Sequence, residues 1–150
     1  MAVEDLRSLK IRPAEPDLIL NRRHQGVHKP HKCLKKYWPG ALTVVLPCKT
    51  EKVPELVRGG AATLGVRMPN HPTALEIIKQ VGVPILGPSA NFHGGKTPYS
   101  FADLDKELVN LVDYVVSGER TVKQASTVID VSVKPWKVLR QGAVELKVEN

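Results

Sequence analysis

Apolar residues along this chain fall in short runs that are separated by proline and glycine. Runs rich in β-branched residues favour extended backbone, because such side chains pack well on a pleated sheet. This pattern predicts β-strands at ALTVVLP (41–47), TLGVRMP (63–69), VPIL (83–86), YVVSG (114–118), TVIDVS (127–132) and WKVLRQG (136–142). VPIL is predicted to be short and buried, and DLIL (17–20) is a further candidate strand.

Apolar residues at helical spacing predict helices between the strands. The strongest pattern is NHPTALEIIKQVG (70–82), where Pro72 suits the first turn and Gly82 suits a left-handed C-terminal cap. Its apolar stripe consists of Leu75, Ile77, Ile78 and Val81.

Three shorter segments also have helical features. VPELVRGG (53–60) predicts one helical turn closed by glycine. Leu6 and Leu9 predict a short helix from Val3 to Lys10. Ser100 and Asp103 have the spacing of a capping box and predict a helix over FADLDKELVNL (101–111).

Strands that alternate with helices predict an α/β fold, and the strands crowded near the C-terminus favour an α+β sheet. We therefore expect a twisted mixed sheet flanked by helices, with residues 1–150 forming a single domain. At 42% hydrophobic residues, the chain has the apolar content for one core. Its apolar runs are far shorter than the roughly 20 residues of a membrane span. Since MAVEDLRSLK also lacks a signal-peptide core, we expect a cytoplasmic protein that does not bind membranes.

A formal net charge of +7 favours polyanionic partners. Much of this charge lies in an atypical basic segment, residues 21–36, which has no acidic side chain. The segment is either a solvated basic face or an RNA contact through residues 22–36, because lysine and arginine neutralise phosphates. Its possible metal ligands do not have the spacing of a structural zinc site, and Pro30 is expected to interrupt any helix there. Those ligands are His24, His28, His31 and Cys33.

The stretch GPSAN (87–91) directly follows the predicted strand VPIL. In open α/β sheets, ligands bind beyond the carboxyl ends of strands, where loop N–H groups can receive anions. Ser89 and Asn91 offer neutral donors at such a place, and glycine lets a phosphate approach the main chain. The same residue types are typical of an ordinary turn, so this pattern alone leaves both interpretations open.

Six motifs in a fixed order narrow the choice. They are KIRP (10–13), YWPGALTVVL (37–46), TLGVRMPNHP (63–72), GPSAN (87–91), ASTVID (125–130) and VLRQGA (138–143). Together they resemble the YrdC-like family of threonylcarbamoyl-AMP synthases, which implies a YrdC/RibB-like fold. The resemblance is dense from Tyr37 to Ala143 and thinner over residues 3–20. The family's usual first strand and helix have no counterpart before KIRP, which leaves the activity of this short form open.

The resemblance implies a nucleotidyltransferase. Family members convert L-threonine, bicarbonate and ATP into threonylcarbamoyl-AMP and pyrophosphate, and the product supplies the tRNA-modification machinery that makes threonylcarbamoyladenosine. The implied catalytic residues are the KxR cations Lys10 and Arg12 and the SxN pair Ser89 and Asn91. Two alternatives stay open: a non-catalytic module that binds double-stranded RNA or tRNA, and an inactive truncated form.

The resemblance also implies substrate contacts. ATP would meet Thr63, Ser89 and Arg140, and threonine would meet Arg67 and Ser126. Arginine binds carboxylate or phosphate through a planar fork of donors, which suits these positions. Mg²⁺ is expected to arrive on the triphosphate, with no metal held by the protein.

Overall fold

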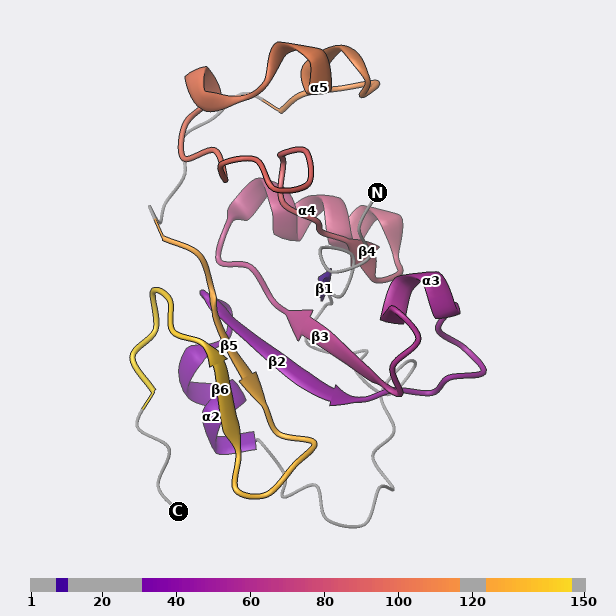
Figure 1. The fold of residues 1–150 in the computed structure, drawn as a ribbon, viewed down its shortest axis with the longest axis vertical. Helices are drawn as coiled ribbons and strands as arrows, with labels where there is room; N and C mark the ends of the chain where they lie inside the picture. Colours follow the sequence, from indigo (N-terminus) through magenta and orange to yellow (C-terminus); the bar gives the residue numbers. More distant parts are fainter. Residues whose placement is uncertain (1–7, 11–30, 117–123, 147–150) are drawn as a thin grey trace.

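The structure is a computed structural model that describes residues 8–10, 31–116 and 124–146. These residues form a six-stranded sheet (Figure 1). β1 runs parallel to β3, and β2 runs parallel to β5, whereas the other neighbouring strands are antiparallel. In spatial order the strands are β4 (Ile85–Leu86), β1 (Ser8–Lys10), β3 (Thr63–Arg67), β2 (Leu42–Pro47), β5 (Thr127–Asp130) and β6 (Lys137–Arg140). The prediction of a mixed sheet flanked by helices is confirmed.

The helices differ in how closely they approach the sheet. Figure 1 shows α2 beside β5 and β6, α4 near β3 and β4, and α5 apart from the sheet at the top of the view. The helical segments are α2 (His31–Tyr37), α3 (Glu55–Arg58), α4 (Pro72–Val81), the 3₁₀ turn η2 (Phe101–Asp103) and α5 (Lys106–Asn110). None of the helices in the described ranges has the length and apolar character that a bilayer crossing needs.

The two faces of the sheet carry different chemistry. Successive strand residues point to opposite faces, so on β2 the side chains of Leu42, Val44 and Leu46 enter the core while Thr43 and Val45 face a cleft. β3 and β5 contribute to the same core, which is covered by α2 and by the C-terminal segment. The partly buried side chains packed against it include Cys33, Leu34, Tyr37, Trp38, Trp136, Val144 and Leu146. One face of the sheet therefore stabilises the fold and the other is available for ligands.

α4 forms as its sequence predicts. Pro72 is the first helical residue, and Gly82 ends the helix with φ 78°, the left-handed region that favours glycine. His71 caps the N-terminus, since its Nδ1 accepts a hydrogen bond from the backbone N–H of Ala74. Ile78 is the fully buried member of the apolar stripe. The shorter α3 also ends as predicted, at a left-handed glycine, Gly59.

The helix predicted from Val3 to Lys10 is wrong at residues 8–10, which form β1. Leu9 pairs with Val66 of β3 on one side and Leu86 of β4 on the other. Two leucines at helical spacing are too short a pattern to exclude a strand, and pairing with strands distant in sequence decides the conformation. Residues 3–7 lie outside the described residues, as does the candidate strand at 17–20.

Three other expectations need correction. VPIL does form β4, but as a two-residue strand at the edge of the sheet, with Leu86 45% exposed rather than buried. The described part of YVVSG, residues 114–116, is not a strand, and Tyr114 is 83% exposed. The helix predicted at 101–111 is divided into η2 and α5, because the Asp105 carboxylate accepts from Glu107 N–H and starts a new helix there.

α2 was not expected within the basic segment. It begins at His31, directly after Pro30, so the proline precedes the helix and does not interrupt one. Cys33, Leu34 and Tyr37 lie at helical spacing and pack against the core. Lysine side chains dominate the segment and hide this apolar stripe.

Candidate functional site

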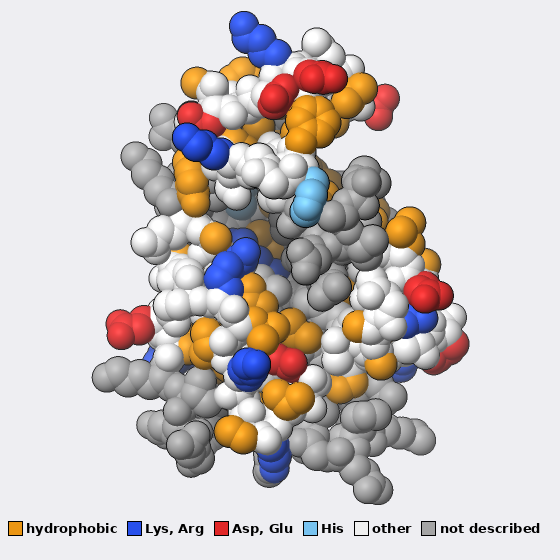
Figure 2. All heavy atoms as spheres, in the orientation of Figure 1, with side chains coloured by type: hydrophobic (Ala, Val, Ile, Leu, Met, Phe, Trp, Pro, Cys, Tyr) orange, Lys and Arg blue, Asp and Glu red, His pale blue; other side chains and the backbone are white. Residues whose placement is uncertain are grey.

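A cleft of about 930 Å³ lies between the non-core face of the sheet and the loop that follows β4. Strand residues form one wall, and residues 87–101 form the other. Figure 2 shows the molecule hollowed between the end that carries α5 and the body of the sheet, with cationic side chains at the edge of the hollow. The cleft volume is at the upper end of the range for small-molecule sites, which leaves room for more than one substrate.

Ser126 is the centre of a hydrogen-bonded group on the sheet wall. Its hydroxyl lies 2.9 Å from Thr43 Oγ1, and it accepts from Arg140 Nη2 at 3.1 Å. Arg140 Nε also donates to the carbonyl of Ser126 at 3.0 Å. Two bonds from one guanidinium fix its plane, so the arginine is oriented before any ligand arrives.

An irregularity in β6 places Arg140 in the cleft. Val128 pairs with Arg140, but the next residue, Ile129, pairs with Val138, so Leu139 is skipped in the register. Such a bulge puts two residues of one strand opposite one of its partner and redirects their side chains. Both Leu139 and Arg140 consequently line the cleft.

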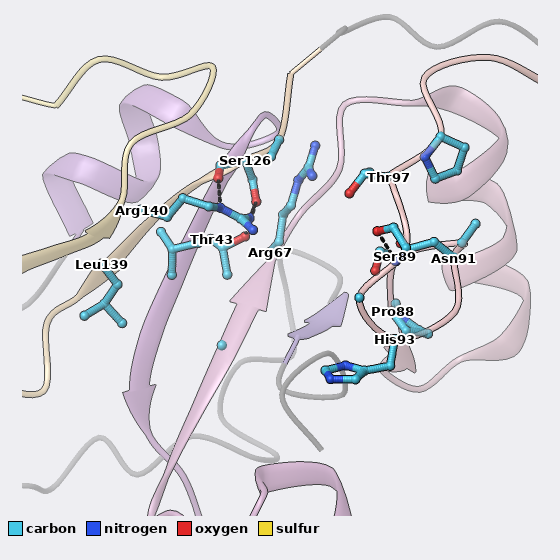
Figure 3. A pocket seen from close by; sticks show the side chains of 18 of the residues that line it. Thr43, Arg67, Pro88, Ser89, Asn91, His93, Thr97, Ser126, Leu139 and Arg140 are labelled. Atoms are coloured by element: carbon cyan, nitrogen blue, oxygen red, sulfur yellow. Dashed lines mark hydrogen bonds between the residues drawn. The ribbon is translucent and has the colours of Figure 1, made fainter. Parts of the chain in front are cut away.

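Arg67 projects from the end of β3 between the two walls (Figure 3). Its Nε donates to the carbonyl of Gly40 at 2.8 Å, and Gly40 N–H donates to Met68 O at 2.8 Å. A Cβ at Gly40 would overlap the carbonyl oxygen of Tyr37, so only glycine fits this crossing. The turn before β2 thus orients an arginine that lies 27 residues later in sequence.

The opposite wall is a turn braced by Asn91. Asn91 Nδ2 donates to Phe92 O at 2.8 Å and to Gly95 O at 3.1 Å. Gly94 adopts φ 75°, and the chain closes through Gly95 N–H to Phe92 O at 2.9 Å. Asn91 Oδ1 is buried and has no hydrogen-bond partner among the described residues. In Figure 3, Ser89 lies on the side of this turn that faces Arg67.

The structure brings most of the predicted site residues into this one cleft. The residues that line it are Thr63, Arg67, Ser89, Asn91, Ser126 and Arg140. Lys10 ends β1, where its backbone pairs with that of Arg67, a residue that lines the cleft. Arg12 lies outside the described residues.

Sequence reasoning missed several polar residues of the cleft. Thr43 and Asp130 follow the strand alternation, since each faces away from the core on β2 or β5. A single sequence does not show that Asp130 pairs with Val45 of β2, which is what places it beside the cleft. His93 and Thr97 belong to the loop wall, where no periodic pattern marks the residues that face inward.

The part of the chain that the structure describes contains no group of three or more His, Cys, Asp or Glu side chains placed to hold a metal. His24 and His28 lie outside that part. Cys33 packs against the core, and burial raises the pKa of its thiol, as it does for Cys48. Neither thiol is poised as a metal-binding thiolate.

The arrangement agrees with a comparison of known families. A family model covering Sua5, YciO and YrdC proteins, described as "Telomere recombination", matches residues 1–142. The chain belongs to this family. Among curated relatives, a threonylcarbamoyl-AMP synthase of Bacillus subtilis is 33% identical over 93% of this chain and 45% of its own length. One from Pseudoalteromonas translucida is 32% identical over 86% of this chain and 75% of its own length.

Solved structures of the family have the same fold. The crystal structure of P. abyssi Sua5 complexed with L-threonine superposes with a TM-score of 0.72 at 33% identity, over 90% of this chain and 39% of that chain. E. coli YciO, at 21% identity and a TM-score of 0.65, supports the fold alone. The chain spans less than half the length of the B. subtilis and P. abyssi relatives.

Proposed function

We propose that this chain is a threonylcarbamoyl-AMP synthase in which residues 1–150 act as one domain. The observation that carries the proposal is the cleft itself, which gathers Arg67 of β3, Arg140 of β6 and the Ser89 turn around one volume. These residues are far apart in sequence and match the motifs of the family. The relatives named as threonylcarbamoyl-AMP synthases, and the Sua5 complexed with L-threonine, support the same substrates here.

The reaction has two bond-forming steps. The amine of L-threonine attacks the carbon of bicarbonate, water leaves, and a carbamate forms. A carbamate oxygen then bonds to the α-phosphorus of ATP while the bond to the bridging oxygen breaks and pyrophosphate leaves. Both nucleophile and phosphate are anionic, so fixed cations and close positioning are the main requirements.

Threonine binds at the sheet wall in this proposal. Arg67 holds its carboxylate, and the bond from Nε to Gly40 keeps the guanidinium in plane for that contact. The Ser126 hydroxyl, between Thr43 and Arg140, completes the threonine site. The KxR cations Lys10 and Arg12 offset the charge of the carbamate as it approaches the phosphate.

ATP spans the cleft from Thr63 to the Ser89 turn. Arg140 and Ser89 meet the triphosphate, and Asn91 maintains the turn through its bonds to Phe92 and Gly95. Mg²⁺ enters with the triphosphate as part of the substrate, bound largely by phosphate oxygens and water. The product passes to a tRNA-modification machinery that transfers the threonylcarbamoyl group to adenosine.

Pyrophosphate release tests the proposal. Purified chain with ATP, Mg²⁺, L-threonine and bicarbonate should release pyrophosphate and form threonylcarbamoyl-AMP, detected by mass spectrometry, and omitting threonine or bicarbonate should abolish both. Arg67→Ala and Ser89→Ala should each lower kcat/KM by roughly 100-fold or more, the usual effect of losing one preorganised donor. Lys79→Ala removes an exposed cation of α4 outside the cleft and serves as the control.

Two results would count against the assignment. A folded wild-type chain that yields no product would refute the activity. If activity is present but the cleft variants behave like Lys79→Ala, the reaction occurs elsewhere and the site is wrong.

A further inference from the structure

The cleft is not uniformly cationic. Asp130 is the one carboxylate among the described residues that line it, and Arg67 and Arg140 are the two arginines. Val128, which pairs with Arg140, lies two residues before Asp130 on β5. At about 3.3 Å per strand residue, the backbone at Asp130 is roughly 7 Å farther along the strand than the row that carries Arg140. The cleft thus has a cationic end and a separate acidic position.

The Asp130 carboxylate is held in a fixed orientation. Its Oδ1 accepts hydrogen bonds from Ser132 N–H at 2.8 Å and from the Ser132 hydroxyl at 2.6 Å. No donor from the described part of the chain bonds Oδ2. Two bonds to one oxygen fix the rotation of the carboxylate, so its acceptor direction is set before a ligand binds.

The surroundings of Asp130 suit an uncharged ring system. Val45 pairs with Asp130 on one side and with Gly65 on the other, so the three residues form a row across β5, β2 and β3. Val128 and Leu139 add further apolar surface to the same cleft. Gly65 has no side chain, which lets a flat ligand approach the sheet closely.

Charge decides which end of a nucleotide can lie here. A carboxylate in a partly enclosed cleft repels the triphosphate and the threonine carboxylate, whereas it accepts hydrogen bonds from neutral donors. The donors of ATP are the ribose hydroxyls and the exocyclic amine of adenine. The phosphates accordingly go toward Arg140, and the nucleoside goes toward Asp130.

We propose that Asp130 is a specificity-determining residue that accepts a hydrogen bond from the nucleoside of ATP. This inference rests on the proposed function in taking ATP as the ligand. It predicts that the Asp130 contact selects a nucleotide over a bare polyphosphate. The donor is either a ribose hydroxyl or the adenine amine, and the two are separated by analogues that lack one of them.

Binding measurements by calorimetry test the inference without requiring turnover. Asp130→Asn keeps the size of the side chain and should raise the Kd for Mg-ATP about tenfold or more, which is the effect of losing a hydrogen bond to a charged group. The Kd for Mg-tripolyphosphate, which has no nucleoside, should stay unchanged or fall. Asp113→Asn, an exposed acid on the segment after α5 and outside the cleft lining, should alter neither.

Binding of nucleotide analogues to the wild-type protein is a second test, which does not depend on whether the variant folds. 2′-Deoxy-ATP and 3′-deoxy-ATP test the ribose hydroxyls, and inosine triphosphate tests the adenine amine. At least one of the three should bind about tenfold more weakly than ATP, and Asp130→Asn should remove that difference. Equal affinity for all four nucleotides overturns the inference, as does an Asp130→Asn variant that weakens Mg-tripolyphosphate as much as Mg-ATP.

The outcome is separable from that of the proposed function. A chain that binds ATP through Asp130 but forms no threonylcarbamoyl-AMP refutes the proposed activity and leaves this inference standing. A chain that forms the product while Asp130→Asn binds ATP normally refutes only the inference. A chain that does not bind ATP refutes both.

Discussion

At the scale of single residues, Thr127 links the core to the site. Its side chain is fully buried, yet its hydroxyl makes three hydrogen bonds with the segment after β6. Oγ1 accepts from Gly142 N–H at 2.9 Å and Val144 N–H at 3.0 Å, and it donates to Val144 O at 2.6 Å. The neighbouring Ser126 lies in the cleft, so this anchor fixes the strand end that carries it.

Removing the Thr127 hydroxyl should destabilise the whole fold. Thr127→Val keeps the shape but leaves the Gly142 and Val144 N–H groups without their acceptor, whereas Val144 O still accepts from Gln141 Nε2 at 2.7 Å. Since each unsatisfied buried group costs about 1–3 kcal/mol, we expect the free energy of unfolding to fall by roughly 3 kcal/mol in urea titrations. Thr127→Ser, which retains the hydroxyl and loses one methyl, should cost about 1 kcal/mol. Equal losses in the two variants would mean that the hydrogen bonds contribute little.

At the scale of elements, the segment after β6 packs unusually closely against the residues just before β5. A Cβ at Gly142 would overlap the carbonyl oxygen of Ala125 and lie 2.7 Å from that of Ser126. Ala143 N–H also donates to Ala125 O at 2.9 Å. Arg140 bonds the carbonyl and the hydroxyl of Ser126. If Gly142 is pushed away from Ala125 and Ser126, the positions of both Ser126 and Arg140 in the cleft should therefore change.

Gly142→Ala should therefore weaken ligand binding more than a glycine substitution that costs similar stability but lies away from the cleft. The methyl group pushes Ser126 away from Arg140, so we expect the Kd values for ATP and for threonine to rise by roughly tenfold or more. Gly82→Ala is the matched control: its left-handed φ of 78° makes alanine unfavourable by about 1 kcal/mol, but it caps α4 away from the cleft. If both variants bind substrates equally well, the contact at Gly142 does not position the site.

Elements with strong local signals were predictable from the sequence. α4 has an apolar stripe, an initial proline and a terminal glycine, and each of these acts within the helix itself. β2 has a dense β-branched run between Pro39 and Pro47, and the run that forms β3 ends before Pro69. Ser8–Lys10 could not be predicted in the same way, because this three-residue strand forms only through pairing with β3 and β4. The same lack of pairing leaves Tyr114–Val116 outside the sheet despite its β-rich composition.

The site was predictable where a motif was present and not where topology alone brings residues together. Arg67, Ser89 and Arg140 each belong to a recognisable sequence block, and the fold gathers them into one cleft. Asp130 ends another block, ASTVID (125–130), but its place in the cleft depends on the parallel register of β5 with β2. His93 is exposed on the turn wall, and nothing in its neighbours distinguishes it from any other loop histidine.

At the scale of the molecule, the sheet separates stability from function. The core face contains Cys48, 5% exposed, and Cys33, partly buried against the same cluster. Burial raises the pKa of both thiols, so the native state retains their protons more tightly than the unfolded chain does. This contribution to stability is present below the ordinary thiol pKa and is lost as the pH rises through the raised value.

Because the core and the cleft are on opposite faces of the same sheet, a ligand in the cleft should affect the labelling of Cys48 through global unfolding. In a Cys33→Ser variant, alkylation of Cys48 by iodoacetamide at pH 8 should be slow, since the thiol is buried and protonated. ATP at 100 times its Kd stabilises the folded state by about 2.7 kcal/mol and should slow the alkylation about 100-fold when labelling follows unfolding. Arg140→Ala should weaken ATP binding under the proposed function, so the same ATP concentration should protect Cys48 far less in that background. Rapid alkylation of Cys48 at a rate that ATP does not change would instead show that the core face opens locally, independently of the cleft on the other side of the sheet.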